Sequence, residues 1–136
     1  IKNEVVYGLE GKSRIDLLME PEISNSDFRK IYVEVKNTTW CDNSLALFPD
    51  TVTTRGQKHL RELMGVCPAS RAVLIPCISR NDMEIFAPGD SADPLYGELF
   101  RKALAKGVEV IPCSFGFFHD HISWEGVKPF RNYEEK

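Results

Sequence analysis

Two stretches near the start of the chain alternate between hydrophobic and polar residues, the period that is typical of β-strands. They run from Ser13 to Met19 and from Lys30 to Lys36. The segment between them is polar and includes Pro21, which favours a loop. We therefore predict two antiparallel strands joined by a loop that is longer than an ordinary hairpin turn.

The second of these strands presents two charged side chains on one face. Because side chains alternate along a strand, Glu34 and Lys36 face one way while Val33 and Val35 face the other. Two positions on one face are about 6.5 Å apart along the strand, so both side chains can reach one metal ion, water or phosphate. Pairing of the two strands brings Asp16 beside Glu34. This set predicts a metal-dependent phosphodiesterase site, and the alternative is a solvated strand face with an ion pair.

The remaining apolar segments predict further helices and strands. Thr54 and Gln57 match a capping box, in which side chains bond the free backbone amides at a helix start. Asp93 followed by Pro94 predicts a second helix start, and Gly107 its end. The expected elements are residues 3–7 as a strand or a helix end, 45–48 as a short antiparallel strand, 54–64 as a helix, 71–78 as a buried strand, 83–86 as a short strand, 94–106 as a helix, 108–112 as the last core strand and 121–126 as a hairpin.

This order indicates an α/β fold of three layers around a mixed sheet, with antiparallel strands followed by helix, strand, helix, strand. The strand, helix and strand between Ala72 and Ile111 predict a right-handed crossover. A chain of 136 residues is large enough for one domain with its own core. Its 43% hydrophobic and 27% charged residues are ordinary for a globular protein, and no apolar run approaches the ~20 residues that span a membrane.

Other features of the sequence bear on the cellular location of the protein and on its binding partners. The first residues lack the apolar core of a signal peptide, and the missing initial Met predicts a piece of a longer protein. The four cysteines have no spacing that suits zinc, and free thiols favour a reducing, intracellular compartment, cytoplasmic or nuclear. The net charge of −3 does not by itself indicate a nucleic-acid-binding protein, although basic side chains gather at Arg55, Lys58, His59 and Arg61.

Seven motifs follow one another along the chain. They are Ser-Arg-Ile-Asp at 13–16, Tyr-Val-Glu-Val-Lys-Asn at 32–37, Phe-Pro-Asp-Thr-Val-Thr-Thr-Arg-Gly-Gln-Lys-His-Leu-Arg-Glu-Leu at 48–63, Arg-Ala-Val-Leu at 71–74, Phe-Ala-Pro at 86–88, Asp-Pro-Leu-Tyr-Gly at 93–97 and Gly-Val-Glu-Val at 107–110. In this order they resemble the sugar fermentation stimulation protein family (SfsA). The likeness covers nearly the whole chain to about Ile111, and the long motif at 48–63 is specific.

The resemblance implies a fold and an activity. The family joins an N-terminal oligonucleotide-binding barrel to a C-terminal domain similar to the PD-(D/E)xK nucleases, and residues 1–136 look like the second domain alone. The likeness implies a metal-dependent nuclease of restriction-endonuclease-like fold, with nucleic acid, most simply DNA, as its partner. Asp16 and Glu34 would bind Mg²⁺ or Mn²⁺, with the carbonyl oxygen of Val35 as a further ligand. Lys36 would orient or deprotonate the attacking water, or stabilise the transition-state charge.

The likeness adds further candidate residues, each with a plainer alternative. Glu4 lies where this class often carries another acid for the metal, and the alternative is an ordinary surface residue. Gln57 would point at the site as a catalytic residue, or act only in the helix cap. Lys58 and Arg61, with Arg55, would contact phosphate groups, or lie on a solvated helix face.

Three functions stay open from the sequence. The first is a metal-dependent nuclease domain, and the second is a DNA-binding or regulatory module without useful turnover. The third is a protein–protein interaction domain in which Glu34 and Lys36 are only surface residues. The intact set of Asp16, Glu34 and Lys36 favours the first, and the near-neutral charge mildly favours the others. A homodimer is compatible with all three, and no membrane partner is expected.

Overall fold

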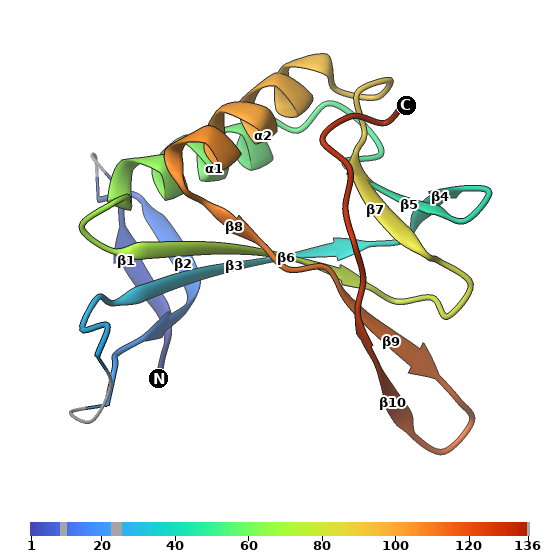
Figure 1. Ribbon diagram of the computed structural model, residues 1–136, viewed down its shortest axis with the longest axis horizontal. Coiled ribbons are helices and arrows are strands. Elements are labelled where there is room, and N and C mark those ends of the chain that lie inside the picture. The colour runs from blue at the N-terminus through green and yellow to red at the C-terminus, as the bar shows by residue number, and fades with distance from the viewer. Residues whose placement is uncertain (9–10, 23–25, 136) are drawn as a thin grey trace.

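The computed structural model describes residues 1–8, 11–22 and 26–135, which form a mixed α/β fold (Figure 1). Its helices are α1 (Thr54–Val66) and α2 (Pro94–Lys106). Its strands are β1 (Lys2–Tyr7), β2 (Ser13–Met19), β3 (Ile31–Thr38), β4 (Trp40–Asp42), β5 (Leu45–Phe48), β6 (Arg71–Ile78), β7 (Ile85–Pro88), β8 (Glu109–Val110), β9 (Cys113–Phe117) and β10 (Ile122–Val127). The larger sheet has the order β1-β2-β3-β6-β9-β10, with β8 also paired to β6, and the smaller sheet has the order β4-β5-β7.

The predicted antiparallel strands at the start of the chain form, and a parallel pair continues the sheet from them. β2 pairs with β3, and β1 joins as a further antiparallel strand on the other side of β2. The helical alternative for residues 3–7 is therefore wrong, because β1 alternates its side chains across the ladder with β2. β3 then runs parallel to β6, from Ile31 opposite Arg71 to Thr38 opposite Ile78. Glu34 lies in the middle of this central pair.

Local capping explains where both helices begin. The predicted cap of α2 is confirmed: Asp93 accepts a 3.0 Å hydrogen bond from the amide of Tyr96, and Gly107 ends the helix with a positive φ of 99°. The capping box at Thr54 is wrong by one residue. Thr53 is the cap, and its hydroxyl accepts a 3.0 Å hydrogen bond from the amide of Gly56. Thr53 has extended backbone angles, as a cap requires, and the helical turn begins only after it.

The mixed sheet with its two helices is as predicted. Both α1 and α2 lie over the same face of the larger sheet (Figure 1). The reason is the strand order, since the chain moves from β3 to β6 and on to β8 in one direction across the sheet. Successive right-handed crossovers in one direction place their helices on one side.

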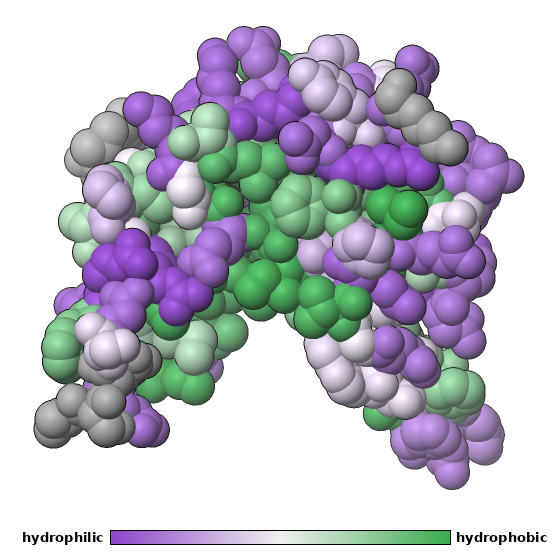
Figure 2. Space-filling view, viewed as in Figure 1, coloured by the Kyte–Doolittle hydropathy of each residue, from purple (hydrophilic) through white to green (hydrophobic). Residues whose placement is uncertain are grey.

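Residues 45–48 form the expected short antiparallel strand, but in the smaller sheet. β5 pairs antiparallel with β4 and parallel with β7, which comes from much later in the chain. The tail also forms a hairpin, but the expected bounds are wrong: residues 122–126 all lie in β10, which pairs antiparallel with β9. This hairpin projects away from the helices, and Figure 2 shows a hollow with a hydrophobic roof between it and the β1–β2 end of the molecule.

The hydrophobic core lies between the two helices and the larger sheet. The largest of its fully buried apolar side chains are Tyr96, Phe86, Phe100, Ile15, Leu47, Leu60, Leu63, Leu74, Ile78 and Met83. All four cysteines are free thiols. No helix within the described ranges has the length and apolar character that crossing a membrane requires. Glu34 and His59 are buried in the same region, although both side chains are polar.

Candidate active site

Three charged or titratable side chains meet over the middle of β3. Lys36 Nζ lies 3.0 Å from Glu34 Oε1, and His59 Nδ1 lies 2.8 Å from the same oxygen. Lys36 Nζ is also 2.7 Å from His59 Nδ1, so the three atoms form a closed triangle. The exposed side-chain fractions are 4% for Glu34, 6% for His59 and 13% for Lys36. The cluster is therefore a buried network, in contrast to the solvated strand face that the sequence left as an alternative.

The two carboxylate oxygens of Glu34 have different surroundings. Oε1 contacts Lys36 and His59, while Oε2 is buried and has no hydrogen-bond partner among the described residues. Burial raises the pKa of Glu34, but the hydrogen bond from His59 and the charge of Lys36 outweigh burial and hold this pKa below its ordinary value. The carboxylate is therefore ionised, and its Oε2 is left without a hydrogen-bond partner among the described residues.

Asp16 is held against β3 by a backbone contact. Its Oδ2 accepts a 2.7 Å hydrogen bond from the amide of Val35, the residue between Glu34 and Lys36. The antiparallel pairing of Leu17 with Val33 lies next to this contact, since Leu17 follows Asp16 and Val33 precedes Glu34. The structure thus brings Asp16 to the part of β3 that carries the other two charged groups.

His59 is the site residue that the sequence reasoning missed, since it was assigned only to a basic group. It lies on α1 and is buried together with Leu60 and Leu63, so this part of the helix faces the sheet. A signal was present in the sequence, because His59 stands four positions before Leu63 on the apolar stripe of the helix. A titratable side chain on a buried stripe needs a partner, and Glu34 is that partner here.

Gln57 is placed at the junction of the two helices. Its amide nitrogen Nε2 lies 2.9 and 3.1 Å from the two carboxylate oxygens of Asp93. The same carboxylate accepts hydrogen bonds from the amides of Thr53 and Tyr96. Among the hydrogen bonds of the described residues, Gln57 makes none with Asp16, Glu34 or Lys36. Its side chain therefore fixes the start of α1 to the start of α2.

A cationic cleft of about 530 Å³ opens beside His59. Arg55 and Lys58 from α1 line it, together with Arg14 from β2. Glu4 also lines the cleft, but it extends from strand β1 and not from a helix, with a φ of 54°. Arg61 lies elsewhere, in a neighbouring cavity that shares Lys58 with this cleft. The predicted phosphate contacts are thus divided between two adjoining surfaces.

Two tyrosine hydroxyls complete the buried polar set. Those of Tyr7 and Tyr96 are buried without a hydrogen-bond partner in the described part of the chain. Burial, followed by the charges of Glu34, Glu62 and Asp16, raises the pKa of Tyr7. Burial and the charge of Glu34 also raise the pKa of Tyr96. Both hydroxyls therefore stay protonated and can act only as neutral donors or acceptors near the carboxylates.

The donor atoms of the site suit a hard divalent cation. No group of three or more His, Cys, Asp or Glu side chains in the described ranges is arranged to hold a metal ion. The available donors are the carboxylates of Asp16 and Glu34, and Glu34 Oε2 is buried without a partner. Mg²⁺ commonly binds through one or two carboxylates and keeps several waters. The residues therefore fit Mg²⁺ or Mn²⁺ and do not fit a structural zinc site.

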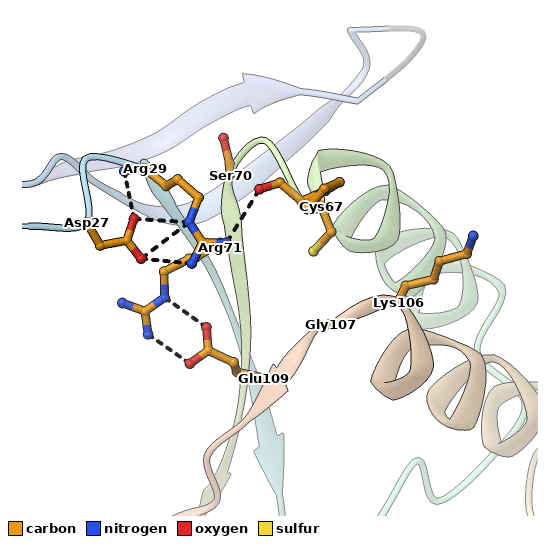
Figure 3. Close-up of a pocket in the computed structure, with 9 residues that line it drawn as sticks. Asp27, Arg29, Cys67, Ser70, Arg71, Lys106, Gly107 and Glu109 are labelled. Carbon is orange, nitrogen blue, oxygen red and sulfur yellow. Dashed lines mark hydrogen bonds and ion pairs between the residues drawn. The ribbon is translucent and has the colours of Figure 1, made fainter.

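A second charged cavity, of about 410 Å³, lies at the other end of α1 and near the start of β6 (Figure 3). Its two arginines are each held by a carboxylate. Arg71 makes hydrogen bonds of 2.9 and 2.8 Å to Glu109, and Arg29 makes its closest contact, of 2.8 Å, with Asp27. Because both arginines are paired with carboxylates in this cavity, we keep the candidate site at Glu34.

The comparisons with known proteins agree with the fold. Residues 1–121 match the family described as "Sugar fermentation stimulation protein RE domain". The chain belongs to this family. It is 76% identical over 135 residues to a sugar fermentation stimulation protein homolog of Prochlorococcus marinus (strain NATL2A), which covers 99% of this chain and 52% of that protein. A homolog from Parasynechococcus marenigrum (strain WH8102) is 66% identical and covers 96% of this chain and 52% of its own length.

The family likeness extends to a solved structure. "The structure of Pyrococcus Furiosus SfsA in complex with Ca2+" superposes with a TM-score of 0.86 at 28% identity, over 96% of this chain and 54% of that one. The chain therefore spans about half the length of the family members that it matches. The family assignment confirms the resemblance inferred from the sequence motifs, and it confirms the restriction-endonuclease-like fold.

Proposed function

We propose that this domain hydrolyses phosphodiester bonds in nucleic acid with the help of a bound divalent cation, Mg²⁺ or Mn²⁺. The observation that carries this proposal is the unpartnered buried oxygen Glu34 Oε2, on the strand to which Asp16 is bound and from which Lys36 extends. The solved relative from Pyrococcus furiosus was studied with Ca²⁺, a cation that also prefers oxygen ligands, which supports a cation site in this family.

Each side chain has a distinct part in this proposal. Asp16 and Glu34 would hold the cation, with the carbonyl oxygen of Val35 and the acid Glu4 as further candidates. The bound cation would polarise the phosphodiester and lower the pKa of a water molecule. Lys36 would orient that water, accept its proton or stabilise the negative charge that develops on the phosphate.

His59 and Gln57 act through other residues. With Nδ1 protonated, His59 donates to Glu34 Oε1, and with Nδ1 unprotonated it accepts from Lys36 Nζ. In both states His59 fixes the two functional groups of β3 relative to each other. Gln57, which the sequence placed among the catalytic residues, would be a positioning residue that holds α1 through Asp93.

The cationic cleft would bind the sugar-phosphate backbone next to this site. Arg55 and Lys58 line the cleft beside His59, so phosphate groups bound there lie close to Glu34 and Lys36. Contacts of this type orient nucleic acid without reading its sequence. We propose DNA as the substrate class. The assay below compares DNA with RNA and so tests whether the sugar must be deoxyribose.

The test is hydrolysis of labelled single-stranded DNA, duplex DNA and RNA in Mg²⁺ and in Mn²⁺. The parent protein should cleave at least one substrate, and both Glu34→Gln and Lys36→Met should lose that activity while keeping the fold. Cleavage that is equal in the parent and in Glu34→Gln would overturn the proposal.

A DNA-binding module without turnover is the second candidate. One observation favours it, since Lys36 already balances the charge of Glu34 without a cation. Metal-independent DNA binding with no cleavage of any of the three substrates would support this candidate over hydrolysis.

A further inference from the structure

An apolar cavity of about 570 Å³ lies between the second half of α1 and the strands β1 and β3. Its wall contains two aromatic side chains, Tyr7 and Tyr32, whose ring centroids are 5.5 Å apart with planes inclined by 31°. Val6 and Val66 add aliphatic surface. Cavities of this size and character commonly hold small organic groups.

The rim of this cavity is cationic. Lys58 and Arg61 stand three positions apart on α1 and therefore on neighbouring parts of its surface. Within the described part of the chain Arg61 forms no ion pair. The acid Glu62 is turned toward Ser13, whose hydroxyl donates to it at 2.6 Å, and lies 3.9 Å from Lys58 Nζ. Aromatic walls below a cationic rim are complementary to a planar base that carries a phosphate.

Two residues connect this cavity to the candidate active site. Lys58 lines both the cavity and the cationic cleft beside His59. Tyr7 also lines the cavity. Its hydroxyl is buried, and the negative charges of Glu34, Glu62 and Asp16 act on it electrostatically. A group bound in the cavity is therefore the neighbour of a phosphate bound over the carboxylates.

We propose that this cavity binds the base of one nucleotide, next to the phosphate that the active site engages. The base rests against Tyr7 and Tyr32, and the phosphate of the same nucleotide contacts Lys58 and Arg61. This inference rests on the proposed action on nucleic acid, which it deepens by assigning a base-binding subsite. An apolar side chain of a partner protein is the competing occupant.

Gly65 gives a direct way to fill the cavity. It lines the cavity from α1, and a Cβ atom at this position meets no other atom within 4 Å. Gly65→Leu therefore adds an apolar side chain at the cavity wall from a Cβ position that is open, and leucine favours the helix more than glycine does. Ala105→Leu is the matched control, because Ala105 is an exposed residue of α2 outside the cavity.

The test is an NMR titration of the metal-free protein with 2′-deoxyadenosine 5′-monophosphate and with deoxyribose 5-phosphate, which lacks the base. The nucleotide should bind the parent and Ala105→Leu about tenfold more tightly than the sugar phosphate, the size that stacking of one base supplies. Its shifts should centre on Gly8, Gly65 and Val66, and Gly65→Leu should lose the preference.

Equal affinity for the two ligands, or a preference retained by Gly65→Leu, would overturn the base subsite and leave an apolar partner group as the occupant. Because the titration contains no metal and no scissile bond, this result leaves the hydrolysis proposal standing. Conversely, base preference in a protein that cleaves no nucleic acid would retain the subsite and remove the hydrolytic function.

Discussion

His59 Nδ1 on α1 lies 2.8 Å from Glu34 Oε1 on β3. This contact joins a helix to the middle of the sheet at the only oxygen of Glu34 that has protein partners in the described structure. It determines which carboxylate oxygen is left without a protein partner among the described residues. The orientation of Glu34 therefore depends on a residue from a different element.

His59→Leu should weaken divalent-cation affinity by about 10- to 100-fold, the usual loss when a group that orients a metal ligand is removed. The reason is that Glu34 Oε1 would then contact only Lys36, and the carboxylate could rotate. His59→Asn, whose side-chain amide can replace Nδ1, should recover part of the affinity. Calorimetric titration of Mn²⁺ measures both, and an unchanged affinity in His59→Leu would contradict the proposed role.

Arg55→Ala and Lys58→Ala should each weaken DNA binding by a similar factor on unrelated sequences, since both side chains line the cationic cleft. Each should also lower the slope of log K against log salt by about 0.9 on duplex DNA, as expected for one lost phosphate contact. Lys102→Ala is the control, because Lys102 pairs with Glu98 on the exposed face of α2. Fluorescence anisotropy at several salt concentrations provides the measurement, and slopes that match that of the control would argue against the cleft.

Asp93→Ala should lower the free energy of unfolding by about 3 kcal/mol, because it removes a helix cap and the hydrogen bonds to Thr53 and Gln57. Asp93→Asn keeps an acceptor and should cost less. Chemical denaturation of the parent, Asp93→Ala and Asp93→Asn measures these differences in the free energy of unfolding.

Asp93 should also make the free energy of unfolding depend on pH. Burial raises the pKa of Asp93, but the hydrogen bonds from Thr53, Gln57 and Tyr96 outweigh it and hold this pKa below the ordinary value of 3.8. The stabilisation is therefore complete above the unfolded pKa and is lost as the pH falls through the folded one. The stability difference between the parent and Asp93→Asn should stay constant near neutral pH and shrink below about pH 4. A difference that grows in acid would refute this account.

Two helical glycines should respond in opposite directions to replacement by alanine. Gly65→Ala should raise the free energy of unfolding by up to about 1 kcal/mol, since the new methyl group meets nothing within 4 Å and alanine favours the helix. Gly97→Ala should lower it, because its Cβ would collide with the carboxylate of Asp90, which pairs with Arg101 at 2.9 Å. Thermal unfolding distinguishes them, and a shift of the same sign for both would count against the packing described here.

The sequence was sufficient to predict the site residues that lie on β2 and β3. It was insufficient to predict the one that lies on α1. Strand alternation placed Glu34 and Lys36 on one face, and hairpin pairing placed Asp16 next to them. His59 reaches Glu34 only because α1 packs over β3, a tertiary relationship that no local pattern states. The same limit applies to Gln57, whose partner Asp93 lies 36 positions later in the chain.

The fold likewise has a part that local sequence signals predict and a part that depends on strand order. Caps and apolar runs predicted most of the helices and strands, because these signals are local. The side of the sheet on which α2 lies depends on the position of β8 beyond β6, which is set by strand order. The separate sheet of β4, β5 and β7 likewise depends on the pairing of Leu45 with Ile85, two short segments far apart in sequence.

A calorimetric titration of Mg²⁺ into the parent protein and into Glu34→Ala tests the central claim most directly. We predict saturable binding of one cation by the parent and none by the variant, because Glu34 supplies the buried oxygen of the site. Circular dichroism of the variant confirms that it is folded. No binding by the parent, or equal binding by both proteins, would contradict the metal centre.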